Sequence, residues 1–192
     1  PNRLREFKAE IFQLTEKYDN FILDYLQYHP ETLYINFSSG AVYGKEFFEP
    51  ANVKTPFRLD INHMVPEDYY GIAKIHAEAK HRALDHWNIV DLRVFGFFSR
   101  FIDLNTKYFM NEVLACLKKG TEFLTGPRNI IRDYVNPRDL AFLVSLCIAK
   151  KTLNDVFDVY SLKPAAKFEI LDYFTQNCGL RYRVQDLSLI HI

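Results

Sequence analysis

The sequence lacks several features that would narrow its class at once. Only three of its 192 residues are cysteines, and they form no Cys-x-x-Cys pair. No apolar run approaches the roughly 20 residues that a membrane-spanning helix needs. A disulfide framework, a cysteine-based metal site and a membrane span are therefore not expected. The scattered thiols favour a cytoplasmic protein.

Neither sign of charge is in excess, and glycine is scarce. The chain has 24 basic and 24 acidic residues, so its formal net charge is zero. This balance provides no field that would attract nucleic acid or an anionic membrane, and neither partner is expected. The seven glycines are dispersed, with no Gly-x-x-Gly-x-x-Gly motif. The chain therefore does not contain the phosphate-binding turn of a dinucleotide site.

The residues that are present follow alternating helix and strand patterns. Apolar residues recur every three or four positions across residues 3–28, which predicts an amphipathic helix that Asp19-Asn20 could kink or divide. Strand–helix–strand order is typical of parallel sheets, with the helix packed on the strands. Strands are predicted at 33–38, 89–95 and 156–160, and helices at 68–87, 104–118, 140–150 and 168–178.

Tyr70 and Lys74 form the most informative polar pair. Residues four apart lie on one face of a helix, so the phenol and the ammonium can reach one site. A phenol titrates near pH ~10, and a nearby cation lowers that pKa by favouring the phenolate. The pair is a candidate acid/base unit. An ordinary surface helix that carries the same two residues is the alternative.

The sequence around this pair resembles a known active-site helix. Residues 70–78 read Tyr-Gly-Ile-Ala-Lys-Ile-His-Ala-Glu. This resembles the short-chain dehydrogenase/reductases, above all their extended branch, the NAD-dependent epimerases and dehydratases of nucleotide sugars. The resemblance implies that Tyr70 is the catalytic acid/base. It also implies that Lys74 lowers the pKa of Tyr70 and holds the nicotinamide ribose of NAD or NADP.

A second motif follows the first predicted strand. Residues 38–44 read Ser-Ser-Gly-Ala-Val-Tyr-Gly, which resembles the Ser-Ser-x-x-Val-Tyr-Gly motif of the same family. The resemblance places Ser39 on the catalytic hydroxyl, bonded to the substrate oxygen, and Ser38 on a cofactor contact. By itself Ser-Ser-Gly would indicate a simple turn. A hydroxyl at the carboxyl end of a strand does, however, lie where open α/β sheets bind ligands.

Two further segments bear on the substrate. Residues 131–141 resemble the family's Arg-Asp-Tyr-Val-His-Val-x-Asp-Leu-Ala segment, which implies that Arg132 binds the nucleotide diphosphate. A forked guanidinium suits that group, although an ion pair with Asp133 or another carboxylate is the alternative. Many relatives carry an Asn that contacts the sugar nucleotide where Gly96 stands here. That contact is not carried over.

The chain is expected to be an internal piece of a longer protein. It begins with Pro1 rather than Met, and residues 187–192 resemble the translation of a sequencing adapter, so we expect a non-native tail. The predicted fold is α/β. It is a Rossmann-like parallel sheet with flanking helices, without its N-terminal strands and Gly-rich turn, plus part of a small C-terminal substrate-binding region. Residues 1–100 would form the nucleotide-binding portion and 101–186 mainly the substrate-binding region, with 156–160 returning to the sheet.

Two functions are compatible with these motifs. The first is an NAD(P)-dependent epimerase or reductase that acts on a nucleotide sugar. A dehydratase would carry an acidic pair directly after the catalytic hydroxyl, where Gly40-Ala41 stand. The second is a non-catalytic module that senses NAD(P) or binds a partner, but such modules commonly lose the Tyr or Lys that this chain keeps. The resemblance leaves a homodimer open, and without the phosphate-binding turn the chain alone is expected to be inactive.

Overall fold

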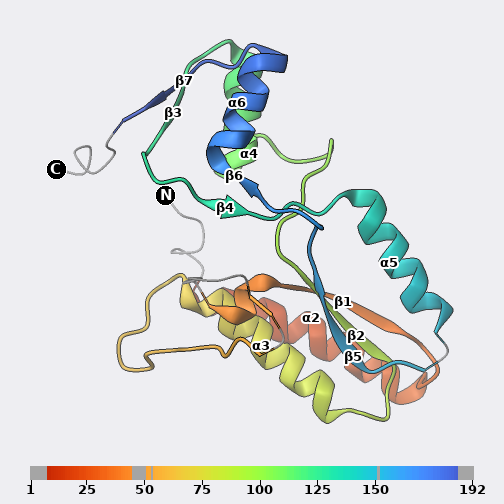
Figure 1. The fold of residues 1–192 in the computed structure, drawn as a ribbon. Helices are drawn as coiled ribbons and strands as arrows, with labels where there is room; N and C mark the ends of the chain where they lie inside the picture. The colour runs from red at the N-terminus through yellow and green to blue at the C-terminus, as the bar shows by residue number, and fades with distance from the viewer. Residues whose placement is uncertain (1–7, 45–50, 53, 151, 186–192) are drawn as a thin grey trace. The chain divides into compact units, whose positions relative to one another are not determined.

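The computed structural model describes residues 8–44, 51–52, 54–150 and 152–185 (Figure 1). The predicted tail at 187–192 lies outside these residues, as do residues 3–7 of the first predicted helix. The chain divides into two compact units. Unit 1 contains residues 1–95 and 138–159, and unit 2 contains residues 96–137 and 160–192.

Unit 1 is built on a three-stranded parallel sheet. Its strands are β1 (Tyr34–Ser39), β2 (Ile89–Val94) and β5 (Asp155–Val159), in the order β1-β2-β5. This confirms the predicted parallel neighbours. Ser39 is opposite Val94, and Val94 is opposite Val159. The carboxyl ends of the three strands therefore meet at one edge of the sheet.

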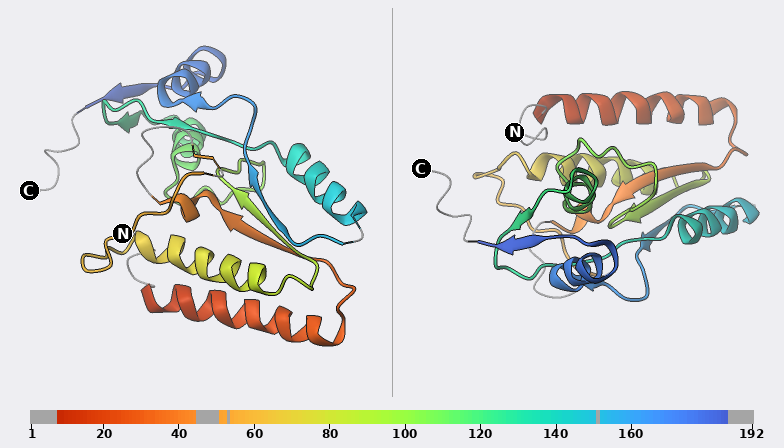
Figure 2. Two further views of the ribbon diagram at one scale, coloured as in Figure 1. Left: turned by 60° about the horizontal axis from the view of Figure 1, so that its bottom comes forward. Right: turned by 90° about the horizontal axis from the view of Figure 1, so that it is seen from above.

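Helices α2 (Lys8–Tyr28) and α3 (Asp68–Ala83) lie side by side on one face of this sheet (Figure 2). A short 3-10 helix, η1 (Gly40–Tyr43), follows β1, and α5 (Pro137–Ala149) precedes β5. The alternative that Asp19-Asn20 divide the helix in two is wrong, because α2 continues through both residues. Asp19 is buried and accepts a hydrogen bond from His81, which removes its tendency to cap a new helix.

The core between α2 and the sheet consists of Leu23, Leu26 and Ile89, with Tyr34, Leu84 and Trp87 packed around them. Helix α3 ends at Ala83, four residues before the predicted end. The Asn154 side-chain amide lies within hydrogen-bond distance of the carbonyl oxygens of His81 (3.2 Å), Leu84 (3.0 Å) and Trp87 (3.0 Å). This amide, distant in sequence, therefore supplies a hydrogen-bond donor to carbonyl oxygens that the end of the helix leaves without a helical partner.

A buried ionic cluster joins α2, α3 and β2. His81, fully buried, places Nδ1 2.8 Å from Asp91 Oδ1 and Nε2 2.7 Å from Asp19 Oδ1. Lys80 lies 2.6 Å from Asp19, and Arg82 lies 3.0 Å from Asp91. Burial lowers the pKa of His81, but the hydrogen bonds and the charges of both carboxylates outweigh it and raise the pKa to about 9. The imidazolium is therefore the form that the cluster holds.

Unit 2 packs two helices beside short strands. Its helices are α4 (Phe109–Lys119) and α6 (Lys167–Cys178). Both end at a glycine in the left-handed conformation, Gly120 (φ 65°) and Gly179 (φ 72°). The core is formed by Val113, Phe123, Leu171 and Leu180.

The strands of unit 2 pair in two small sheets. β3 (Phe123–Thr125) runs parallel to β7 (Tyr182–Val184), and β4 (Ile131–Arg132) runs antiparallel to β6 (Ala165–Ala166). Helix α4 begins at Phe109 rather than at the predicted position 104. The preceding residues form a turn in which Asp103 O accepts from Thr106 N (3.1 Å) and Thr106 Oγ1 (2.7 Å), and such local bonds compete with the helix.

The described residues contain free thiols only, at Cys116, Cys147 and Cys178. They contain no group of three or more His, Cys, Asp or Glu side chains arranged to hold a metal ion. No helix in the described ranges is both long and apolar enough to cross a membrane.

Candidate active site

The first predicted site residue, Ser39, lies at the carboxyl end of β1. Its main chain is extended (φ −145°, ψ 150°), and its Oγ accepts a hydrogen bond from Ala41 N at 3.2 Å, so it caps η1. The hydroxyl is partly buried rather than enclosed. Ser39 is therefore held at the sheet edge where parallel α/β sheets bind ligands.

Tyr70 lies in the first turn of α3, which begins where the sequence predicted. The turn before it is fixed by Asp68, whose side chain accepts from Val65 N at 2.8 Å and whose amide donates to Val65 O at 2.9 Å. The next residue, Gly71, is buried against η1: a Cβ there would lie 2.6 Å from Ala41 O. Glycine thus allows the start of α3 to approach the turn that Ser39 caps.

Lys74 lies one helical turn after Tyr70, and the structure brings the two together as predicted from their spacing. Lys74 Nζ is 5.9 Å from the centroid of the Tyr70 ring and donates to Phe37 O at 2.9 Å. Burial lowers the pKa of Lys74, while the charges of Asp91, Glu78 and Asp19 oppose that effect. The Lys74 Nζ is therefore held beside the phenol and hydrogen-bonded to the strand that carries Ser39.

Ser38 is oriented differently from Ser39. Its side chain is buried, and its Oγ donates to Glu78 Oε1 at 2.5 Å. The hydroxyl is therefore unavailable to a cofactor unless this bond breaks. A cofactor contact at Ser38 stays a prediction.

A hydrogen-bonded ionic network that sequence reasoning missed lies behind these residues. Arg93 on β2 donates to Glu78 on α3 through Nε (3.0 Å) and Nη2 (2.6 Å). Through Nη1 it also donates to Tyr43 Oη at 2.7 Å, and that hydroxyl donates to Asp158 on β5 (2.8 Å). Burial and the bond to Asp158 raise the pKa of Tyr43 to about 12. Two charged residues, Asp91 and Arg93, inside a strand whose other residues are apolar were the signal available in the sequence.

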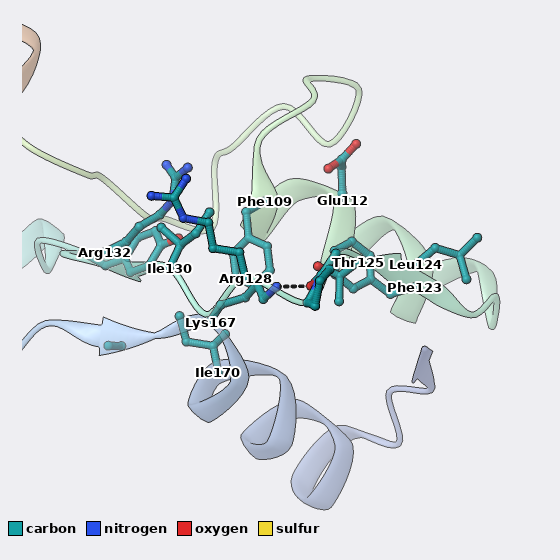
Figure 3. Close-up of a pocket in the computed structure, with 14 residues that line it drawn as sticks. Phe109, Glu112, Phe123, Leu124, Thr125, Arg128, Ile130, Arg132, Lys167 and Ile170 are labelled. Atoms are coloured by element: carbon teal, nitrogen blue, oxygen red, sulfur yellow. Dashed lines mark hydrogen bonds between the residues drawn. The ribbon is translucent and has the colours of Figure 1, made fainter. Parts of the chain in front are cut away.

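Unit 2 contains a pocket of about 280 Å³ (Figure 3). Its apolar wall comes from α4, β3 and α6. Its cationic side comes from Arg128, between β3 and β4, and from Arg132 in β4, which point to the same side of the pocket (Figure 3). The lining includes Phe109, Phe123, Leu124, Arg128, Arg132 and Ile170.

The segment that carries the two arginines is held by α6. Lys167 Nζ donates to Gly126 O at 2.5 Å, and Lys167 N donates to Ile130 O at 2.9 Å. Asp133 accepts bonds from both the amide (2.7 Å) and the hydroxyl (2.8 Å) of Ser161. Within the described ranges, no carboxylate forms an ion pair with Arg132. The alternative that Arg132 pairs with Asp133 is therefore not what the structure shows.

Comparison with known proteins gives a family match over most of the chain. A model described as the NAD dependent epimerase/dehydratase family matches residues 8–162. No curated protein matches the sequence.

Solved structures with this fold include three proteins with NAD or NADPH bound. UDP-glucose-4-epimerase from Stenotrophomonas maltophila, with NAD and formylated UDP-arabinopyranose, is 17% identical over 95% of this chain and 60% of its own, with a TM-score of 0.78. RMD from Pseudomonas aeruginosa, with NADPH, is 15% identical over 96% and 63%, with a TM-score of 0.77. dTDP-glucose 4,6-dehydratase from Bacillus anthracis, with NAD, is 12% identical over 87% and 54%, with a TM-score of 0.68.

These likenesses support the fold, a Rossmann-like parallel sheet with flanking helices. The chain spans 54% to 63% of the length of the three solved chains.

Proposed function

Because the chain belongs to the NAD dependent epimerase/dehydratase family, we propose that it carries the acid/base site of an NAD(P)-dependent epimerase or reductase that acts on a nucleotide sugar. The observation that carries this proposal is the Lys74 cation fixed 5.9 Å from the Tyr70 ring centroid, on the helix that packs against the turn capped by Ser39. Together the three side chains offer the base, the cation and the hydrogen-bond donor that proton transfer at a sugar hydroxyl requires.

Each of the three residues has a distinct role. Tyr70 Oη removes the proton from the reacting sugar hydroxyl and returns it in the reverse direction. The Lys74 cation favours the phenolate and so brings the base closer to neutral pH. Ser39 Oγ donates a hydrogen bond to the same sugar oxygen, which orients it for transfer. NAD(P), when bound, supplies hydride transfer at the sugar carbon.

The residues present fit one end of the cofactor. Lys74 provides a cation for the ribose hydroxyls next to the nicotinamide, and it lies one helical turn from Tyr70. The pyrophosphate, in contrast, needs a Gly-rich turn at a helix N-terminus, which this sequence does not contain. The chain thus supplies the reactive end of the cofactor site.

The pocket in unit 2 suits the nucleotide part of the substrate. Arg128 and Arg132 present two guanidinium groups, and a diphosphate carries two negative charges that such forks bind in a bidentate manner. The wall formed by Phe109 and Phe123 offers aromatic surface for a base. A pocket of about 280 Å³ is near the lower end of small-ligand sites.

Gly40-Ala41 favour epimerase or reductase chemistry over dehydration. In η1 these two residues follow Ser39 directly, and neither offers an acid or base for elimination of water. A non-catalytic sensor of NAD(P) is the second candidate. The position of the Lys74 Nζ, 5.9 Å from the Tyr70 ring centroid and hydrogen-bonded to Phe37 O, favours catalysis, because a sensor has no need of a lysine held beside a phenol.

The test is Tyr70→Phe in the full-length protein that contains this chain. Turnover of nucleotide sugars with NAD(P) should fall by about 100-fold or more, since general acid/base groups contribute roughly 10²–10⁴. NAD(P) affinity, measured by fluorescence titration, should change little. An unchanged turnover rate would remove Tyr70 from the mechanism, and binding without turnover in the wild type would favour the sensor.

We also propose that α2 joins two copies of the protein. One face of the helix carries five large apolar residues that are 50–80% exposed. Their spacing alternates between four and three, the heptad pattern of helices that pack on one another. At about 150–250 Å² for a large side chain, they offer roughly 600 Å², near the ~800 Å² per partner of a stable interface. The face consists of Leu14, Tyr18, Phe21, Tyr25 and Tyr28.

Analytical ultracentrifugation of the full-length protein tests this homodimer. Phe21→Glu, at the centre of the face and 70% exposed, should shift the protein from dimer to monomer. The matched control is Leu162→Glu, an exposed apolar residue of unit 2, which should leave the dimer intact. A wild type that sediments as a monomer at micromolar concentration would contradict the proposal.

A further inference from the structure

Helix α3 holds the end of β1 by two hydrogen bonds in consecutive turns. Lys74 Nζ donates to Phe37 O at 2.9 Å, and one turn later Glu78 Oε1 accepts from Ser38 Oγ at 2.5 Å. The two strand residues are adjacent and immediately precede Ser39. The pair of bonds therefore fixes how far α3 can slide along β1, which sets where Tyr70 stands relative to Ser39.

Glu78 is itself held by an ion pair with Arg93 on β2. Its Oε1 accepts from Arg93 Nε (3.2 Å) and its Oε2 accepts from Arg93 Nη2 (2.6 Å), and Arg93 Nη1 also lies 3.6 Å from Asp158 Oδ1. Both members of the pair have little exposure, with side chains 8% and 18% exposed. A bidentate pair of this kind fixes the orientation of the carboxylate as well as its position.

The same network reaches the turn after β1. Arg93 donates to Tyr43 Oη at 2.7 Å, and Tyr43 is the last residue of η1, the helix that Ser39 caps. Glu78 therefore connects, through Ser38 on one side and Arg93 on the other, the strand end and the turn between which Ser39 lies. Apolar residues would fill this space with less desolvation cost, so the ionic pair provides orientation rather than net stability.

We propose that Glu78 is a positioning residue for the acid/base reaction: by holding the Ser38 hydroxyl, it sets the distance between Ser39 on β1 and the Tyr70–Lys74 pair on α3. This inference rests on the proposed function of Tyr70. Glu78 contacts neither substrate nor cofactor in this assignment and acts only through Ser38 and the strand end.

The first test is Ser38→Ala in the full-length protein. It removes the bond to α3 and leaves the ion pair of Glu78 with Arg93 in place, so the fold should persist. We expect kcat to fall on the order of 10- to 100-fold, the range for a misplacement of about 1 Å, with KM for the nucleotide sugar within about twofold. Ser38→Thr, which returns a hydroxyl to a strand position, should recover most of kcat.

A double-mutant cycle with Glu78→Leu tests whether the two residues act as one unit. The double variant should lose no more kcat than the more damaged single variant, whereas independent structural effects would add. Lys80→Met is the matched control on the same helix. It removes the ion pair with Asp19 on the α2 side and should leave kcat within about twofold.

The outcomes separate this inference from the proposed function. A folded Ser38→Ala variant with kcat within about twofold of the wild type, or additive losses in the cycle, would overturn the role of Glu78. If Glu78→Leu does not fold, Ser38→Ala and Ser38→Thr decide the question by themselves. Tyr70→Phe runs in the same assay: full activity there refutes the acid/base function, while an inactive Tyr70→Phe with a normal Ser38→Ala refutes only the positioning.

Discussion

The buried imidazolium of His81 should make the stability of the protein fall as the pH rises above neutral. Burial lowers the pKa of His81, but its bonds to Asp19 and Asp91 raise it to about 9 in the folded state, against ~6.5 in an unfolded chain. The stabilisation is fully present below pH ~6.5 and is lost as the pH rises through about 9. The difference corresponds to about 3 kcal/mol at most, of which roughly 2–3 kcal/mol disappears between pH 7 and pH 10.

Asp19 acts with the opposite sign in a different range. Burial raises the pKa of Asp19, but the bonds to His81 and Lys80 outweigh it and lower the pKa overall. Its stabilisation is therefore present above the unfolded pKa of ~3.9 and is lost only on acidification. Asp19 therefore does not contribute to the change in stability from pH 7 to pH 10.

Urea unfolding of the full-length protein at pH 7, 8, 9 and 10, followed by circular dichroism, measures the effect. His81→Gln should lower stability at pH 7 and give a flatter curve up to pH 10, because no imidazolium is left to titrate. His63→Gln is the control, since the side chains of His63 and Asp60 are 82% and 64% exposed. Equal slopes for the wild type and His81→Gln would show that the cluster does not hold a proton on His81.

Three further predictions follow from the site. Gly71→Ala places a Cβ 2.6 Å from Ala41 O, so it should cost about 1–3 kcal/mol of stability and lower kcat. The control Gly179→Ala has no atom within 4 Å of the new Cβ, so it should lower stability through its positive φ but leave kcat unchanged. Urea unfolding and initial rates measure both variants. Arg128→Gln and Arg132→Gln should each raise KM for the nucleotide sugar by roughly 10-fold or more with little change in kcat, while Arg183→Gln on β7 should change neither; steady-state kinetics decide. The 192-residue chain alone should show no saturable micromolar binding of NADH in a fluorescence titration, because it lacks the Gly-rich turn, and such binding would place a phosphate site within these residues.

The parallel sheet and the helix with Tyr70 were predictable because their signals are local. The apolar runs at β1, β2 and β5 and the four-residue spacing of Tyr70 and Lys74 each lie within a few residues of sequence. The structure places these segments as neighbours, and Lys74 beside Tyr70.

The features that were missed depend on partners distant in sequence. Asp19 was expected to disturb α2, because its partner His81 is 62 positions away and cannot be read from the helix pattern. The end of α3 was predicted too late in the sequence. The side chain that binds the carbonyl oxygens at the helix end is Asn154, which directly precedes β5 and is about 70 residues away. Arg128 in the pocket follows a Gly-Pro turn that sequence patterns mark only as a loop.

The order of the strands along the chain affects how the protein is made. About 65 residues separate Val90 from its partner Asp155, and the intervening chain includes the first part of unit 2. At a synthesis rate of ~5–20 residues per second, one edge of β2 stays unpaired for roughly 3–13 s before β5 is made. Unit 2 is likewise incomplete until β7 is made, because β7 pairs with β3. The chain crosses between the units three times. A fragment that ends at Phe95 would therefore contain β1 and β2 but not β5. To express unit 1 by itself, residues 138–159 would have to be fused to residues 1–95.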